Sequence, residues 1–140
     1  VQEIIDRVEM LHKRAIGLLL FEPRGCFGRF WFTLRASEAK EDALEYINQA
    51  EVLYTAGLNT DYPAGKVEYA ARAAERLALG AIQFFQKWKG NSNLRPFKKE
   101  ISEIVQAKEL IKLQSGDLYE LAECVIQASN RVFDFVENRC

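Results

Sequence analysis

Between Pro63 and Gly90 the chain carries apolar side chains at every third or fourth position, which is the spacing of one helix face. Proline is favoured in the first turn of a helix and glycine commonly ends one, so these two residues mark the expected ends. The first half of the face is almost entirely alanine, and small side chains let neighbouring helices approach closely. We therefore expect the central helix of a bundle here. The face comprises Val67, Ala70, Ala71, Ala74, Leu77, Ala78, Ala81, Phe84, Phe85 and Trp88.

The rest of the chain shows the same helical spacing, and apolar-polar alternation over a strand length is hard to find. Further helices are predicted at about residues 2–20, 37–56 and 96–114, and from residue 117 onward. Connections after the second helix are short, which favours antiparallel neighbours. The sequence therefore predicts an all-α fold, an up-and-down bundle of about five helices that forms a single domain over residues 1–140.

Local signals predict where individual helices begin and which side chains they bury. Ser37 and Asp61 are placed to cap the second and third helices, and Asp117, with a glutamate three residues later, has capping-box spacing. Leu44 and Val105 fall on the predicted core faces of the second and fourth helices.

The composition excludes several classes of protein. Hydrophobic residues make up 49% and charged residues 28% of the chain, so disorder is not expected, and a net charge of −1 gives no argument for a general nucleic-acid binder. The longest apolar run, residues 16–21, is too short to span a membrane. Cys26, Cys124 and Cys140 show no metal-ligand or disulfide-framework spacing, so no metal or other cofactor is predicted and a reducing, cytoplasmic location fits best.

One residue pair has the spacing of a catalytic motif. His12, the single histidine, follows Arg7 with four residues between them, which matches the Arg-x4-His pattern of certain helical ribonucleases. Positions five apart lie roughly 140° apart around a helix, so the two side chains are not expected on one face. Arg7 and His12 are the candidate catalytic residues, but we expect a non-enzymatic domain in which His12 is solvated or partly buried with a backbone partner.

A block of positive charge without a single acid spans residues 86–99. We call its cations the basic corner: Lys87, Lys89, Arg95, Lys98 and Lys99. The first two fall at the end of a predicted helix, where cations are favoured, whereas the last two fall in the first turn of the next helix, where they are disfavoured. The basic corner is a candidate anion-binding surface for phosphate, RNA or an acidic peptide. Trp88 and Phe97 either lie exposed beside it or pack inward.

The aromatic and arginine-rich connection at residues 21–36 is a candidate partner-binding segment. Four large aromatic residues within six positions cannot all point to one side of a helix, so some are expected to be exposed or to meet a second surface. Arginine and aromatic residues are the types that dominate binding hot spots. Core packing by this connection, or by a short extra helix, is the alternative. The candidate partner-binding residues are Arg24, Arg29, Phe30, Trp31 and Arg35.

Charge is segregated along the chain. Residues 37–62 carry six acids and one base, and residues 100–140 carry eight acids and four bases, on either side of the basic corner. This pattern can be satisfied within the fold, or it can steer a charged partner.

The runs Glu41–Tyr54, Gly57-Leu58 and Tyr69–Ala78 resemble the helical hairpin of HEPN-like domains. Active members of that family are ribonucleases that carry an Arg-x4-6-His motif on a later helix, and no histidine follows His12 here. The resemblance therefore implies a non-catalytic member that acts by binding.

The same small residues also resemble helical hairpins of the MIT and tetratricopeptide type, which bind short peptide helices between their helices. Both resemblances imply an interaction domain. We therefore expect an adaptor that binds a protein partner or peptide helix, with a homo-oligomer also possible. The alternative is a HEPN-like RNA-binding or RNA-processing protein that uses the basic corner.

Overall fold

A computed structural model describes residues 2–20, 29–90 and 92–139, with the side chains of residues 29–36 left out. The five α-helices of these residues are α1 (Gln2–Leu19), α2 (Arg29–Leu58), α3 (Pro63–Lys89), α4 (Lys98–Lys112) and α5 (Leu118–Arg139). A single 3-10 turn, Arg95–Phe97, precedes α4. The described residues contain no strand, so the predicted all-α class is confirmed.

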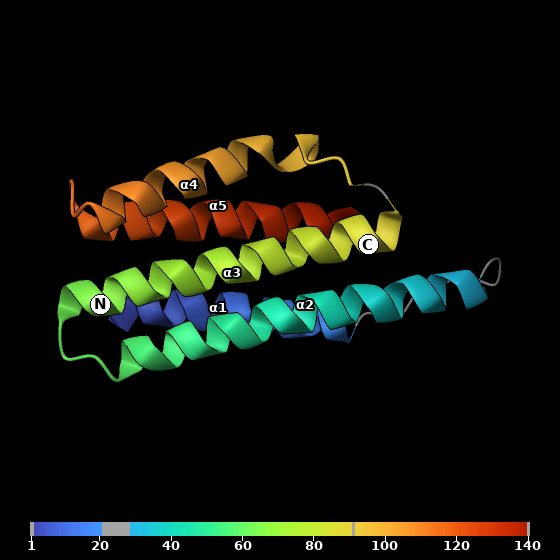
Figure 1. The fold of residues 1–140 in the computed structure, drawn as a ribbon, viewed down its shortest axis with the longest axis horizontal. Helices are drawn as coiled ribbons and strands as arrows, with labels where there is room; N and C mark the ends of the chain where they lie inside the picture. The colour runs from blue at the N-terminus through green and yellow to red at the C-terminus, as the bar shows by residue number, and fades with distance from the viewer. Residues whose placement is uncertain (1, 21–28, 91, 140) are drawn as a thin grey trace.

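The helices form the expected up-and-down bundle, in which each helix runs antiparallel to the one before it (Figure 1). Helix α3 lies at the centre, with α2 along one side and α5 along the other, while α4 packs chiefly on α5. Helix α1 packs mainly on α3 and makes fewer contacts with α2 and α5. The predicted central position of α3 is therefore correct.

Several predicted helix ends need correction. Helix α2 begins at Arg29, so Ser37 lies inside the helix and the expected 21–36 connection is shorter. No proline or glycine lies between Arg29 and Gly57, and aromatic residues are tolerated in helices, so nothing in the sequence stops α2 earlier. At the start of α3 the N-cap is Tyr62, without a side-chain hydrogen bond, rather than Asp61.

Other predicted ends are confirmed. Pro63 opens α3, and Gly90 ends it with φ of 66°, a left-handed conformation that glycine adopts easily. The carboxylate of Asp117 caps α5, because its Oδ1 accepts hydrogen bonds from the backbone N–H groups of Tyr119 and Glu120 at 2.9 and 3.4 Å.

Small residues bring α2 and α3 into close contact. A Cβ atom on Gly80 of α3 would lie 2.9 Å from the Cβ of Tyr46 on α2, and one on Gly57 of α2 would lie 3.0 Å from the Cβ of Tyr69 on α3. At each of these glycines, a tyrosine of the neighbouring helix therefore packs directly against the helix backbone. The hairpin is consequently packed backbone against backbone, as the alanine-rich face predicts.

The prediction that two apolar residues of α2 and α4 lie in the core is wrong. Leu44 is 44% exposed and Val105 is 51% exposed. The described parts of α2 and α4 bury only one side each, because α2 borders the bundle below α3 and α4 borders it beyond α5 (Figure 1). Residues on the flank of an outer helix are therefore left partly in solvent.

Ion pairs fasten α1 and α4 to α5. Arg14 of α1 reaches Asp134 and Glu137 at 2.6 and 2.9 Å, and the hydrogen bond to Glu137 is the main cause that raises the pKa of Arg14. Arg131 of α5 pairs with Glu103 of α4. These contacts turn the arginine side of α1 toward α5 and leave its other side toward α2.

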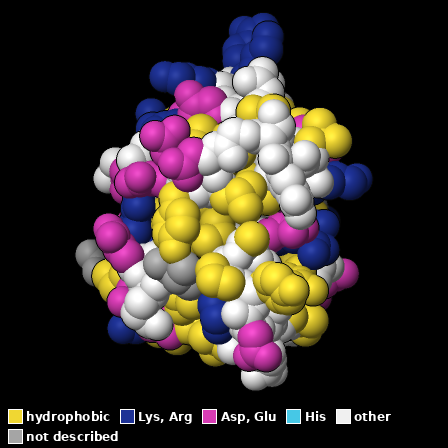
Figure 2. Space-filling view, turned by 90° about the vertical axis from the view of Figure 1, so that its left-hand side faces the viewer, with side chains coloured by type: hydrophobic (Ala, Val, Ile, Leu, Met, Phe, Trp, Pro, Cys, Tyr) yellow, Lys and Arg dark blue, Asp and Glu magenta, His cyan; other side chains and the backbone are white. Residues whose placement is uncertain are grey.

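The two ends of the bundle differ in character. The end formed by the α2–α3 and α4–α5 connections exposes apolar side chains among charges of both signs (Figure 2). Large exposed residues at these element ends are Leu58, Tyr62, Leu113 and Tyr119. The basic corner lies at the opposite end. No helix among the described residues is both long and apolar enough to cross a membrane.

Candidate functional site: the groove between α1 and α2

A hollow of about 390 Å³ lies between α1 and α2, with α3 as its floor. Val8 of α1, Ala50 of α2 and Ala73 and Leu77 of α3 supply its apolar surface. Its remaining lining residues are Glu9, His12, Lys13, Glu51, Tyr54 and Thr55. Helix α1 packs mainly on α3 and less closely on α2, and the hollow lies where α1 and α2 stand apart.

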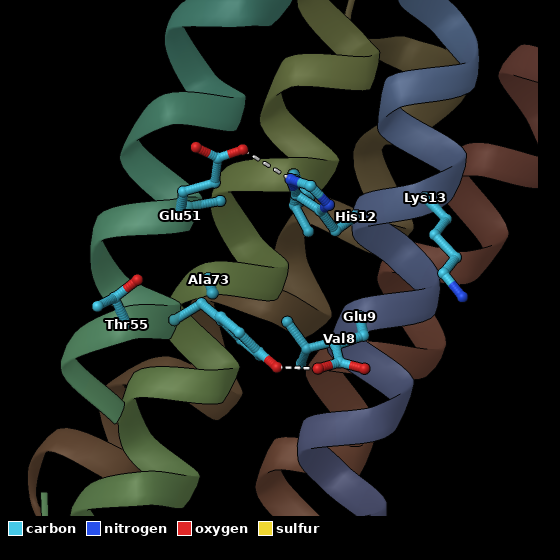
Figure 3. Close-up of a pocket in the computed structure, with 10 residues that line it drawn as sticks. Val8, Glu9, His12, Lys13, Glu51, Thr55 and Ala73 are labelled. Carbon is cyan, nitrogen blue, oxygen red and sulfur yellow. Dashed lines mark hydrogen bonds and ion pairs between the residues drawn. The ribbon is translucent and has the colours of Figure 1, made fainter. Parts of the chain in front are cut away.

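Two polar bridges cross the groove (Figure 3). The His12 ring contacts Glu51, with 2.9 Å between Nε2 and Oε1, and the hydroxyl of Tyr54 donates to the carboxylate of Glu9. Each bridge joins α1 to α2 above the apolar floor. The polar groups of the groove therefore pair with one another across it, while Lys13 points away from α2 (Figure 3).

The Tyr54 bridge changes the acidity of the phenol. Burial of the ring raises the pKa of Tyr54 to about 12, and the hydrogen bond to Glu9 and the negative charges of Glu9 and Asp6 add to the effect. Since the folded-state pKa lies above the ordinary value of 10.0, Tyr54 contributes stability that is complete below about pH 10. This contribution is lost as the pH rises through 12.

We expect Tyr54 to ionise with a pKa of about 12, well above the ordinary tyrosine value of 10.0, in a titration followed by the NMR shifts of the ring carbons. Glu9→Gln should lower the pKa of Tyr54 only part of the way, because burial remains. A pKa of Tyr54 close to the ordinary value of 10.0 in the wild-type protein would contradict the bridge. A Glu3→Gln variant removes an equal charge from α1 and should leave Tyr54 unchanged.

The structure does not bring Arg7 and His12 together. Arg7 pairs with Glu123 of α5 at 3.0 Å, whereas His12 meets Glu51 of α2. The two side chains leave α1 on different flanks, as their five-residue separation predicts. The geometry thus argues against a joint catalytic role, and His12 has a carboxylate partner in place of the expected backbone partner.

The basic corner remains a cluster of exposed cations, and its two aromatic residues pack inward. Phe97 is 1% exposed and Trp88 is also buried. Phe97 lies in edge contact with Phe85 and Phe135, at centroid distances of 5.7 and 5.0 Å. Of the two alternatives for these aromatics, inward packing is therefore confirmed.

The aromatic and arginine-rich segment stays a prediction. Arg24 lies outside the described residues. Arg29, Phe30, Trp31 and Arg35 lie in the first turns of α2, where the backbone is described and the side chains are not. The part of the chain that is described contains no group of three histidine, cysteine, aspartate or glutamate side chains that could hold a metal ion.

Comparisons of the chain with protein-family models, curated proteins and solved structures gave no match. The resemblances to HEPN-like and MIT-type hairpins therefore stay predictions, and function is argued from the geometry alone.

Sequence reasoning missed the groove residues Glu9, Glu51 and Tyr54. Glu51 lies 39 residues from His12 in the chain, and Tyr54 lies 45 residues from Glu9. The sequence did contain one signal for the groove, which is that Glu9 and His12 are three residues apart and therefore lie on the same side of α1. Only the position of α2 shows what that side faces.

Proposed function

We propose that this domain binds an amphipathic helix of another protein in the groove between α1 and α2. The observation that carries the proposal is the hollow of about 390 Å³ between α1 and α2, which lies over a buried apolar floor and has exposed leucines of α2 beside it. A helix lying along two others buries its apolar stripe in such a groove, with anchor residues spaced three and four apart.

The flank of α2 that borders the groove has the spacing of a helix-packing seam. Leu44 and Leu58 lie seven residues before and after Glu51, so all three project on the same side of α2. Leu44 is 44% and Leu58 46% exposed. A docked helix would cover both leucines, which extend the apolar contact beyond the hollow in each direction.

Charge favours a partner with basic residues beside its apolar stripe. The two arginines of α1 are turned toward α5, so Glu3, Asp6 and Glu9 face solvent opposed by Lys13 alone. Residues 37–62, which include most of α2, carry six acids and one base. The surface of α1 away from its arginines and residues 37–62 therefore both carry net negative charge, and lysine or arginine on a partner would complement them.

The bridges support docking rather than catalysis. A catalytic centre needs polar groups that converge on one point where a substrate can sit. Here His12 and Tyr54 are each directed at a carboxylate on the facing helix. Each polar group is thus occupied by a partner on the facing helix, and the two bridges do not converge on one point in the hollow.

A designed peptide tests this proposal. The probe is a labelled helical peptide of about 18 residues with leucines three and four apart, prepared with either lysine or glutamate flanks, and binding is measured by fluorescence anisotropy. We expect the lysine peptide to bind at least tenfold more tightly, with NMR shift changes confined to the groove.

Glu51→Trp should place a large ring across the hollow and reduce the affinity of the lysine peptide at least tenfold. Glu45→Trp is the matched control, because it makes the same change at an exposed position on another side of α2. Docking in the groove would be contradicted if Glu51→Trp and Glu45→Trp lost the same affinity for the lysine peptide. It would also be contradicted if the wild-type protein bound the lysine and glutamate peptides with equal affinity.

A further inference from the structure

The basic corner is a second surface, distinct from the groove, and the fold adds a further cation from α5 to it. The end of α3, the segment before α4 and the first turn of α4 supply its cations. The guanidinium of Arg139 lies 3.6 Å from the centre of the Phe135 ring, which packs against Phe97 at 5.0 Å. This stack brings a further cation from the end of α5 to the same end of the bundle (Figure 1).

Few carboxylates are left to neutralise these cations. Asp134 and Glu137 pair with Arg14, and Glu100 pairs with Arg131. Lys87 lies 3.9 Å from Asp42, the longest of the ion pairs between described residues. The other four cations of the basic corner are exposed and make no ion pair with any described residue, although the ammonium group of Lys89 lies 4.1 Å from the centre of the Trp88 ring.

An apolar side chain lies among these cations. Leu94 is 50% exposed and immediately precedes Arg95. It is the one large hydrophobic residue exposed among the described residues between 86 and 99, because Trp88 and Phe97 are buried. The described residues between 86 and 99 therefore combine several cations with an exposed leucine and present no exposed aromatic ring for a nucleic-acid base to stack on.

We propose that the basic corner docks this protein on the surface of a membrane that contains anionic lipids. Lysine and arginine near such a surface are attracted to its negative headgroups, and an exposed leucine gains by entering the boundary between headgroups and acyl chains. A nucleic acid would use the cations without the leucine. A protein partner would need a larger apolar centre than Leu94 supplies.

Vesicle sedimentation tests the proposal with the full chain. The probes are vesicles of phosphatidylcholine alone and vesicles with about 30% phosphatidylserine, at low and physiological salt. We expect saturable binding to the anionic vesicles alone, weakened by salt. Lys98→Gln with Lys99→Gln should reduce partitioning about 30-fold, since each basic residue contributes about a factor of five. Leu94→Ser should reduce it about tenfold.

Matched variants at the opposite end of the bundle are the controls. Lys66→Gln with Lys112→Gln removes the same charge, and Leu113→Ser removes an exposed leucine, and neither should change vesicle binding. Glu51→Trp should also leave it unchanged, which separates this proposal from docking in the groove.

Two results would overturn membrane docking. One is an equal loss of vesicle binding in the double lysine variants at the two ends of the bundle. This result would show that net charge alone attracts the protein to the vesicles. The other is absence of vesicle binding combined with salt-sensitive binding of a labelled RNA strand that Leu94→Ser leaves unaffected. That outcome would assign the surface to phosphate backbones.

Discussion

Phe97→Ala is expected to lower the free energy of unfolding by about 3–5 kcal/mol, measured by urea denaturation. Phe97 is 1% exposed and packs in edge contact with Phe85 of α3 and Phe135 of α5. Removing its ring leaves a cavity where these two helices meet the start of α4, and deletes two aromatic contacts.

Leu94→Ala is the control for Phe97→Ala, because it shortens a half-exposed side chain in the same segment. Its effect should stay within about 0.5 kcal/mol, as for most surface substitutions. A loss below about 1 kcal/mol in Phe97→Ala would show that the aromatic cluster does not hold α4 in place.

Gly80→Ala is expected to destabilise the protein by about 1–3 kcal/mol, although alanine is the better helix former. The new Cβ would lie 2.9 Å from the Cβ of Tyr46, an atom attached directly to the α2 backbone. Because that atom cannot rotate away, α2 and α3 must move apart along their contact. Thermal unfolding followed by circular dichroism measures the effect.

Gly17→Ala makes the same substitution where no atom lies within 4 Å of the new Cβ. Gly17 is exposed and helical, so alanine should stabilise the protein there by about 0.5–1 kcal/mol. Opposite signs for the two variants are the expected result. Stabilisation by Gly80→Ala would mean that the α2–α3 contact is looser than the structure indicates.

The helix starts show how far local sequence signals reach. Pro63, Gly90 and Asp117 mark helix ends correctly, because each acts through its own backbone or through its immediate neighbours. Ser37 does not, since a serine can cap a helix or lie within one. The choice depends on whether the preceding residues continue the helix.

The candidate site was less predictable than the fold. The groove is lined by three helices, and its bridges join residues 39 and 45 positions apart. No spacing rule within one helix relates such residues. The basic corner was visible in the sequence because its cations all lie within residues 86–99. Arg139, in contrast, joins it through a contact between α5 and the segment before α4.

The sequence by itself determined the helical class and the order of the helices, because the period of apolar residues reports which side of each helix is buried. It also determined the central place of α3, because the small side chains of its alanine-rich face let neighbouring helices approach closely. Only the tertiary structure decided which neighbour each side meets. Arg7 faces α5 and His12 faces α2 because α1 lies over α3 between them. That position depends on how all the helices pack together, and no single helix encodes it.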